Sequence, residues 1–335
     1  MSTDLEIVTP PTEHVLSAAA WRRRFRDQPI VPLLLLLTLL VLLLFTIQPG
    51  LLGRPQAWVT STIRFATPLA ILAACQTLTM LTGGIDLSVA TVASATGFIV
   101  ASQAPGQGPA VAIVLGLCVA GCFGLINGIG VSIFRVQPLI MTLGTGLVAA
   151  GLLVIYQRYV ITVGARVPEG VVWLASGTSF GFFPNCLLLF VPLAAAIIIG
   201  LRRTGYGRLL YAVGDNPIAA RLAGVRVWQV LLVLYTISGI LAGIAGVMVA
   251  GVTNTAAPSG ADSYLLPSVA AAVIGGTSIF GGRGGYSGTI VGALILTVLA
   301  SVLTVLKAPE PVRMIVYGAI ILTVAAAYAR VTGER

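Results

Sequence analysis

Several polar side chains stand inside apolar stretches of the sequence or at their ends, where they could hydrogen-bond to a hydroxyl-rich solute. Asp86 is the only charged residue between Arg64 and Arg135. A carboxylate at the centre of a membrane helix costs roughly 2.5 to 3.5 kcal/mol, so this one must be shielded from lipid. On a water-lined path its two oxygens would accept hydroxyl protons. The predicted path residues are Gln76, Asp86, Ser88, Asn127, Asn254, Thr277 and Ser278.

The same residues also have purely structural interpretations. Asp86 follows a pair of glycines and precedes a predicted helix, so it can cap that helix by accepting backbone N–H bonds. Ser88 would assist at the same positive helix end. The three amide side chains can bridge neighbouring helices, which is the more common role of such groups in membranes. Capping and solute contact are compatible, so both stay open for Asp86.

Residues for enzyme chemistry are scarce. His14 is the only histidine and lies in a polar tail, and no acid pair is present for general acid–base work. The four cysteines all lie in or beside apolar segments, which indicates buried thiols instead of metal ligands or disulfides. They are Cys75, Cys118, Cys122 and Cys186. The sequence therefore predicts no catalytic residue and no metal site, and a membrane-embedded enzyme is a weak alternative.

The basic residues neither bind ATP nor form a nucleic-acid surface. Eighteen of the nineteen are Arg, and the single lysine, Lys307, lacks the preceding glycines of a phosphate-binding loop. The arginines stand beside apolar segments without interleaved aromatic residues, so no nucleic-acid partner is expected. An ion-coupled secondary transporter, the main alternative, usually carries a chain of intramembrane acids, and only Asp86 is present. The energy source for transport is therefore expected on another protein, and no cofactor is expected on this chain.

The elements that position these residues are membrane helices. Of 335 residues, 57% are hydrophobic and 9% are charged, which is too few charges to cover a water-facing surface. Apolar segments of spanning length recur, so the predicted fold is an all-α polytopic membrane protein with about ten transmembrane helices. The segments are residues 30–47, 62–81, 85–102, 109–134, 138–156, 185–201, 229–251, 264–281, 287–306 and 312–329.

The charge distribution predicts the orientation of these segments. Residues 1–28 form a polar tail with four arginines, and residues 29–330 a single transmembrane domain. A cleaved signal peptide is the lesser alternative, because the first apolar core is long and no small-residue cleavage site follows it. With the tail in the cytoplasm, thirteen basic residues fall on that side and six on the other. By the positive-inside rule both termini are expected in the cytoplasm.

Paired glycines interrupt two of the segments. Gly83 and Gly84 precede Asp86 in the third segment, and Gly275 and Gly276 lie in the eighth. Such pairs free backbone groups at membrane depth, as in the broken helices of transporters. The two glycine pairs lie five segments apart, and an odd number of membrane crossings reverses the direction in which a segment runs through the membrane. We therefore expect segments two to five and seven to ten to be inverted repeats, with their broken helices meeting near the middle of the membrane.

The predicted cytoplasmic loop 202–228 contains a short helix with both ends specified. Asn216 suits the N-cap, Pro217 the first helical position, and Gly224 the left-handed residue after the helix. A helix of this kind outside the membrane is typical of a docking element, although its arginines would also suit lipid headgroups. The predicted docking residues are Gly214, Asp215, Asn216, Pro217, Ala219, Ala220, Arg221, Ala223 and Gly224.

Three segments in this order resemble the permease subunits of ATP-binding-cassette sugar importers of the ribose, xylose and arabinose type, within the branched-chain amino acid and ribose permease superfamily. They are residues 82–89 (Thr-Gly-Gly-Ile-Asp-Leu-Ser-Val), residues 214–224, and residues 270–278 continuing into 281–284. The resemblance extends from about residue 30 to residue 330.

This resemblance implies a multi-pass protein of the bacterial inner membrane that translocates a monosaccharide by alternating access. It implies three protein partners: a second copy of this chain, a cytoplasmic ATPase subunit that binds ATP and Mg²⁺, and a periplasmic sugar-binding protein. By the same resemblance, residues 214–224 form the coupling helix that sits in a cleft of the ATPase. The identity of the sugar stays open, because specificity in such importers lies largely in the binding protein.

Overall fold

The computed structural model describes residues 30–160 and 165–332. The predicted cytoplasmic tail 1–28, with His14 and its four arginines, lies outside the described residues. The helices are α2 (Ile30–Ile47), α3 (Pro55–Leu81), α4 (Val89–Gln107), α5 (Pro109–Ser132), α6 (Pro138–Val160), α7 (Glu169–Ser176), α8 (Cys186–Arg203), α9 (Gly205–Asp215), α10 (Pro217–Leu222), α11 (Val227–Thr253), α12 (Leu265–Ile274), α13 (Tyr286–Val305) and α14 (Glu310–Thr332).

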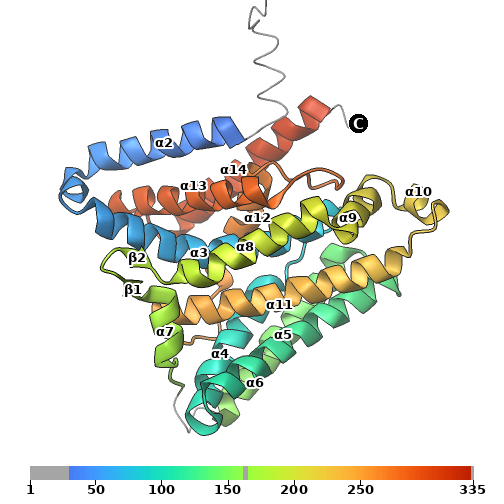
Figure 1. Ribbon diagram of the computed structural model, residues 1–335, viewed down its shortest axis with the longest axis horizontal. Helices are drawn as coiled ribbons and strands as arrows, with labels where there is room; N and C mark the ends of the chain where they lie inside the picture. The colour runs from blue at the N-terminus through green and yellow to red at the C-terminus, as the bar shows by residue number, and fades with distance from the viewer. Residues whose placement is uncertain (1–29, 161–164, 333–335) are drawn as a thin grey trace, which may run out of the picture.

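The long helices lie side by side in one bundle (Figure 1). The short helices α9 and α10 stand at one end, which we call the α10 end. At the opposite end lie α7 and a hairpin of two antiparallel strands, β1 (Thr178–Ser179) and β2 (Phe183–Pro184), with Thr178 opposite Pro184. Two 3₁₀ turns, Pro49–Gly53 and Asp262–Tyr264, complete the described elements. The predicted all-α class is confirmed.

Each of the ten predicted apolar segments overlaps a described helix, but the count of about ten spans is not confirmed. Seven of the described helices are long and apolar enough to cross a membrane, namely α2, α3, α5, α6, α8, α11 and α13. Helix α12 has only ten residues, about 15 Å of rise, which is half of a hydrocarbon core. Helices α4 and α14 are not among these seven.

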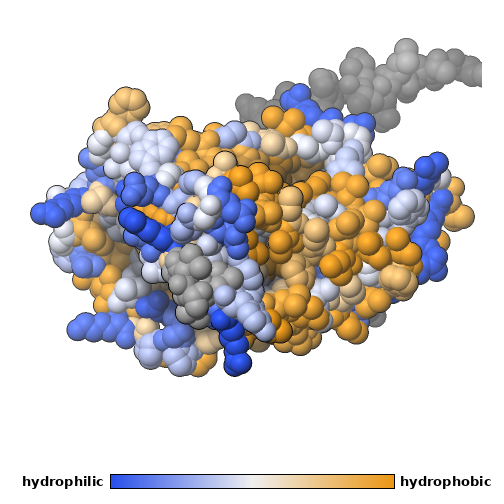
Figure 2. Space-filling view, turned by 90° about the horizontal axis from the view of Figure 1, so that it is seen from below, coloured by the Kyte–Doolittle hydropathy of each residue, from blue (hydrophilic) through white to orange (hydrophobic). Residues whose placement is uncertain are grey.

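The outer surface carries the apolar side chains that a bilayer requires. Only two of the eighteen residues of α2 are buried, and α6 exposes a row of large aliphatic side chains. On the face shown in Figure 2, apolar side chains cover much of the right half, and the most hydrophilic ones gather toward the left and at the right-hand edge. This pattern agrees with a membrane protein whose middle faces lipid and whose ends face water.

The core forms around α11, which packs against α3, α4 and α5. Its contact with α5 depends on small residues. Gly124 of α5 faces Gly239 of α11, and a Cβ atom on either would collide with the backbone of the other helix. Such small residues let two membrane helices approach closely, so van der Waals packing can replace the missing hydrophobic force.

The two glycine breaks lie side by side at the α10 end, so the expectation that they meet is confirmed. They connect α3 to α4 and α12 to α13, so they precede or follow helices instead of interrupting the third and eighth spans. The Gly282 N–H donates to the Leu81 carbonyl at 2.9 Å across them. The inverted repeat itself stays a prediction; α3 and α11 both have 27 residues, and α6 and α14 both have 23.

The cysteine prediction was half right. Cys75 and Cys186 are buried, whereas Cys118 and Cys122 are exposed on the surface of α5. The sequence offered no way to separate these pairs, because α5 is apolar on all sides and its outward face meets lipid instead of protein.

Candidate functional site

The Asp86 carboxylate lies at the centre of a buried hydrogen-bond network. Ser88 donates to Oδ1 twice, from its backbone nitrogen at 3.0 Å and from its hydroxyl at 2.6 Å. The Ser238 hydroxyl of α11 donates to Oδ2 at 3.1 Å. Asp86 is 1% exposed, so these bonds replace the water that a carboxylate needs. The shielding required by the sequence is therefore present.

The network continues through α5 and α6. Asn127 of α5 donates to the Ser88 hydroxyl at 2.9 Å, and Thr145 of α6 donates to the Asn127 side-chain oxygen at 2.5 Å. All of these residues are buried. Side chains from four separate segments thus join around one carboxylate, and Asn127 bridges helices as the commoner interpretation of membrane amides predicts.

The backbone of the first break is held by two further side chains. Gln76 of α3 donates to the Asp86 carbonyl at 2.7 Å and accepts from the Asp86 nitrogen at 3.3 Å. Thr142 of α6 accepts from the Leu87 nitrogen and donates to the Ile85 carbonyl. These bonds satisfy backbone groups that no helix can satisfy in residues 82–88, as membrane depth requires.

Asp86 does not itself occupy the N-cap position of α4. Ser88 is the N-cap residue of that helix, and its side chain makes no capping bond. The carboxylate accepts the Ser88 N–H from two residues upstream, so Asp86 turns the chain into α4 rather than capping its first turn. The sequence therefore placed the N-cap two positions too early, at Asp86 instead of Ser88. Asp86 does accept a backbone N–H bond, as predicted.

The remaining predicted path residues lie elsewhere. Thr277 and Ser278 belong to the second break, where both are buried and the Ser278 hydroxyl accepts from the Phe280 nitrogen. Asn254 is exposed and left-handed, with φ of 51°, at the C-terminal end of α11, so it ends a helix away from the network. The structure therefore brings together Gln76, Asp86, Ser88 and Asn127 and leaves out the other three.

Sequence reasoning missed Ser238, Thr142 and Thr145. Thr142 and Thr145 carried a weak signal, since their spacing of three places two hydroxyls on one face of an apolar helix. Ser238 carried no signal, because serine commonly occurs with glycine and alanine where membrane helices pack closely.

Helix α9 packs directly against both breaks. Gly214 touches the Leu81 carbonyl, and a Cβ atom there would also lie 2.7 Å from the Gly282 nitrogen. The Tyr211 hydroxyl donates to the Gly284 carbonyl at 2.9 Å. Burial raises the pKa of Tyr211 above its ordinary value, so the hydroxyl keeps its proton and stays a donor. We call Leu81, Gly214 and residues 281–284 the junction.

A second tyrosine ties α9 to the core helix. The Tyr206 hydroxyl donates to the Val230 carbonyl of α11 at 2.9 Å. Burial also raises the pKa of Tyr206, which keeps this donor protonated. Helix α9 is thereby fixed to α11 at its start and to the junction near its end, so it can move with the bundle as one body.

The predicted docking helix forms as α10, directly after α9. The Asn216 side chain accepts from the nitrogens of Ile218 and Ala219, both at 3.0 Å, and Pro217 occupies the first position. Gly224 has φ of 85°, and the Val225 nitrogen donates to the Ala220 carbonyl to close the end of the helix. All three sequence signals for the ends of this helix are confirmed.

The outward face of α10 carries two residues that the sequence prediction omitted. Ile218 is 68% exposed and Leu222 is 85% exposed, and their spacing of four places them on one face. Ala220 is instead buried against the bundle, and Gly214 belongs to α9 and the junction. Two residues of the predicted docking set, Gly214 and Ala220, therefore pack against the bundle. The exposed apolar face of α10 consists of Ile218 and Leu222.

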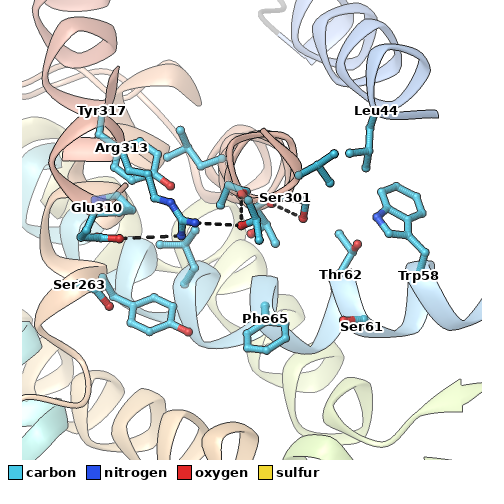
Figure 3. A pocket seen from close by; sticks show the side chains of 18 of the residues that line it. Leu44, Trp58, Ser61, Thr62, Phe65, Ser263, Ser301, Glu310, Arg313 and Tyr317 are labelled. Atoms are coloured by element: carbon cyan, nitrogen blue, oxygen red, sulfur yellow. Dashed lines mark hydrogen bonds and ion pairs between the residues drawn. The ribbon is translucent and has the colours of Figure 1, made fainter. Parts of the chain in front are cut away.

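A cavity of about 540 Å³ lies between α2, α3, α13 and α14 (Figure 3). Arg313 forms an ion pair with Glu310 at 3.8 Å and donates to the Thr304 hydroxyl at 3.2 Å. Serine and threonine hydroxyls share the wall with the rings of Trp58 and Phe65. None of the seven predicted path residues lines it. Hydroxyls with aromatic rings suit a polyol, but the residues that supply them lie too far apart in sequence to form a motif.

Substitution of Asp86 separates its structural role from a role of its charge. Asp86→Asn keeps one oxygen for Ser88, so we expect the thermal stability of the purified protein to change by less than about 1 kcal/mol. Asp86→Ala leaves the Ser88 nitrogen, the Ser88 hydroxyl and the Ser238 hydroxyl without their acceptor. We expect this to lower the free energy of unfolding by about 2 to 4 kcal/mol. Fluorescence-detected unfolding in detergent measures both. Equal stability of the two variants would contradict the network as described.

The chain matches the family described as "branched-chain amino acid transport system / permease component" over residues 59–325. The ribose import permease RbsC of Bacillus subtilis is 31% identical over 85% of this chain and 88% of its own length. RbsC of Escherichia coli K12 is 34% identical over 76% and 79%. The fructose import permease FrcC of Rhizobium meliloti is 34% identical over 69% and 66%.

No solved structure matches the chain. The family match covers the junction, α10 and the whole Asp86 network, so the site described above lies within the shared region. The match also confirms that this chain is the membrane component of a transport system, and the predicted resemblance is correct. The protein belongs to the family of branched-chain amino acid transport system permease components.

Proposed function

We propose that this chain is the permease subunit of an ATP-binding-cassette importer that carries a monosaccharide across the bacterial inner membrane. The relatives that support this proposal are named as ribose and fructose import permeases. The cavity between α2 and α14 has serine and threonine hydroxyls beside aromatic rings in a largely apolar wall, which suits such a solute. ATP and Mg²⁺ would bind to a separate ATPase subunit, and a sugar-binding protein would deliver the sugar on the periplasmic side.

The observation that carries the proposal is the geometry of α10. A helix with both ends closed presents Ile218 and Leu222 outward, and an apolar pair at this spacing is the form in which a short helix enters a groove of another protein. We propose that the ATPase supplies this groove. The α10 end of the bundle would then face the cytoplasm, and we propose the same side for both termini.

The junction suggests how ATPase movement reaches the solute path. Helix α10 follows α9 after the single residue Asn216, and α9 contacts both glycine breaks through Gly214 and Tyr211. In the state described, Asp86 is buried and its oxygens are occupied, so a sugar reaches it only after the packing changes. Alternating access would be this change between two packings, biased by ATP and by the binding protein.

We propose a homodimer, in which the solute path is completed by a second copy of the chain. Much of the apolar surface of α6 is exposed, including Ile140, Leu147 and Ile155. Either lipid or a second copy can cover such a face.

Copurification and transport together test the proposed function. The tagged chain is expressed with its native neighbours, and the ATPase and binding protein that copurify are identified by mass spectrometry. Reconstituted vesicles are then given radiolabelled ribose or fructose outside and ATP inside. We expect uptake that requires ATP and the binding protein. Uptake driven by an ion gradient without the ATPase would overturn the proposal.

A further inference from the structure

A second cavity, of about 430 Å³, lies beneath the docking helix at the α10 end. Its wall is formed by the last turn of α5, the loop 133–137, α10, and the first turns of α11, with Thr82 of the first break. We call it the α10 cavity. On α10 it is lined by Pro217 and Arg221, whose chain neighbours Ile218 and Leu222 are exposed and do not line it.

The charged residues at the α10 cavity are all positive. Three exposed arginines line it, Arg135, Arg221 and Arg226, and no acidic residue does. Among the residues that the structure describes, none of the three guanidinium groups has an ion-pair or hydrogen-bond partner. The 27-residue helix α11 also begins at this wall, and its first turn has no side-chain cap. The positive end of a long helix adds to the arginine charges and favours an anion.

Two buried hydroxyls supply an independent indication of a ligand. Tyr235 is fully buried, lines the α10 cavity, and its hydroxyl has no hydrogen-bond partner within the described residues. The Ser132 hydroxyl, in the same wall, is also buried without a partner there. An unpaired buried hydroxyl costs about 1 to 3 kcal/mol, so two of them in one cavity indicate a missing acceptor.

We propose that the α10 cavity binds a phosphate group, which arrives either on a cytoplasmic phosphate monoester or on an anionic lipid headgroup. Guanidinium groups pair with phosphate oxygens in bidentate fashion, and the hydroxyls of Tyr235 and Ser132 can donate to the remaining oxygens. The cavity has room for a phosphate and a small polyol. Binding at this site does not depend on the proposed transport function.

An occupied α10 cavity would restrain the docking helix. Pro217 and Arg221 belong to α10, whereas Arg135 follows α5 and Arg226 precedes α11. A phosphate shared by these arginines joins α10 to the ends of two core helices. This step rests on the proposed function. If imported sugar is phosphorylated in the cytoplasm, the sugar phosphate formed could bind in the α10 cavity and slow further uptake.

Binding to the purified, detergent-solubilised chain tests the proposal. Glycerol 3-phosphate is titrated by isothermal calorimetry against glycerol as the uncharged control. In parallel, native mass spectrometry compares retention of phosphatidylglycerol with that of phosphatidylcholine. The variants are Arg135→Gln/Arg226→Gln, which removes two guanidinium groups, and Tyr235→Phe, which removes only the buried hydroxyl. Arg208→Gln is the matched control, because Arg208 of α9 is exposed like the cavity arginines but lies outside the cavity.

Saturable binding of glycerol 3-phosphate, weakened at least tenfold in the double variant and in Tyr235→Phe but unchanged in Arg208→Gln, supports the site with a free monoester as its ligand. Selective retention of phosphatidylglycerol that the same variants abolish supports the site with a lipid headgroup. Absence of both, or binding that the variants do not change, overturns the proposal and leaves the arginines as topology signals. The unfolding temperature of each variant is measured as well, and a value equal to that of the wild type shows that the loss of binding is not caused by misfolding.

Discussion

Gly214→Val is expected to prevent recovery of folded protein from membranes, whereas a substitution nine residues earlier leaves it intact. A Cβ atom at Gly214 would overlap the Leu81 carbonyl and lie 2.7 Å from the Gly282 nitrogen. Both neighbours are backbone, so neither can rotate away. Overpacking of this kind typically costs 1 to 3 kcal/mol, and two extra methyl groups against backbone bring the expected cost above about 3 kcal/mol. Fluorescence-detected size-exclusion chromatography and thermal unfolding measure the loss.

Alanine substitutions make this prediction sharper, because helix propensity alone predicts the opposite sign. Replacing glycine by alanine inside a helix normally gains up to about 1 kcal/mol. At Gly205, in the first turn of α9, a Cβ atom would meet only the end of the Arg208 side chain within 4 Å, at 3.9 Å. Gly205→Ala should therefore be neutral or stabilising, and Gly214→Ala destabilising by about 2 kcal/mol. Equal effects at the two positions would show that the junction is not tightly packed.

The sequence predicted local chemistry well and three-dimensional neighbours poorly. Asn216, Pro217 and Gly224 each specify a backbone position within their own few residues, so α10 could be placed without the fold. Asp86 was identified because charge inside an apolar stretch is costly in any arrangement of helices. Neither inference requires knowledge of what packs against the segment.

The errors arose where distant segments meet. The two glycine breaks were predicted to interrupt the third and eighth segments, and only the fold shows that they connect α3 to α4 and α12 to α13. Gly214 was assigned to the docking surface because it precedes Asn216, and only packing shows that it touches Leu81. Asn254 was grouped with Asn127 because both are amides in apolar segments or at their ends. The α10 cavity was missed because Arg135 lies in a different loop from Arg221 and Arg226.

A charge on the outward face of α10 is expected to separate the permease from its ATPase without unfolding it. Ile218→Glu/Leu222→Glu changes side chains that are 68% and 85% exposed, so the bundle loses little packing. In the complex, each glutamate would be buried in an apolar groove without a partner, at an expected cost of at least about 2 kcal/mol per residue. Together they should weaken ATPase binding by roughly a thousandfold or more. Copurification with the ATPase and ATP-driven uptake in vesicles are the measurements.

Gln229→Glu is the control for added charge, since Gln229 is exposed near the start of α11 and the variant adds one negative charge outside α10. Ala220→Leu tests the opposite face of α10. Ala220 is 6% exposed and faces the bundle, so a larger side chain there should lower the thermal stability of the permease more than its affinity for the ATPase. If the double glutamate variant copurified with the ATPase as wild type does, α10 would not be the docking element. If Ala220→Leu lost the ATPase at full stability, the buried face of α10 would instead contact the partner.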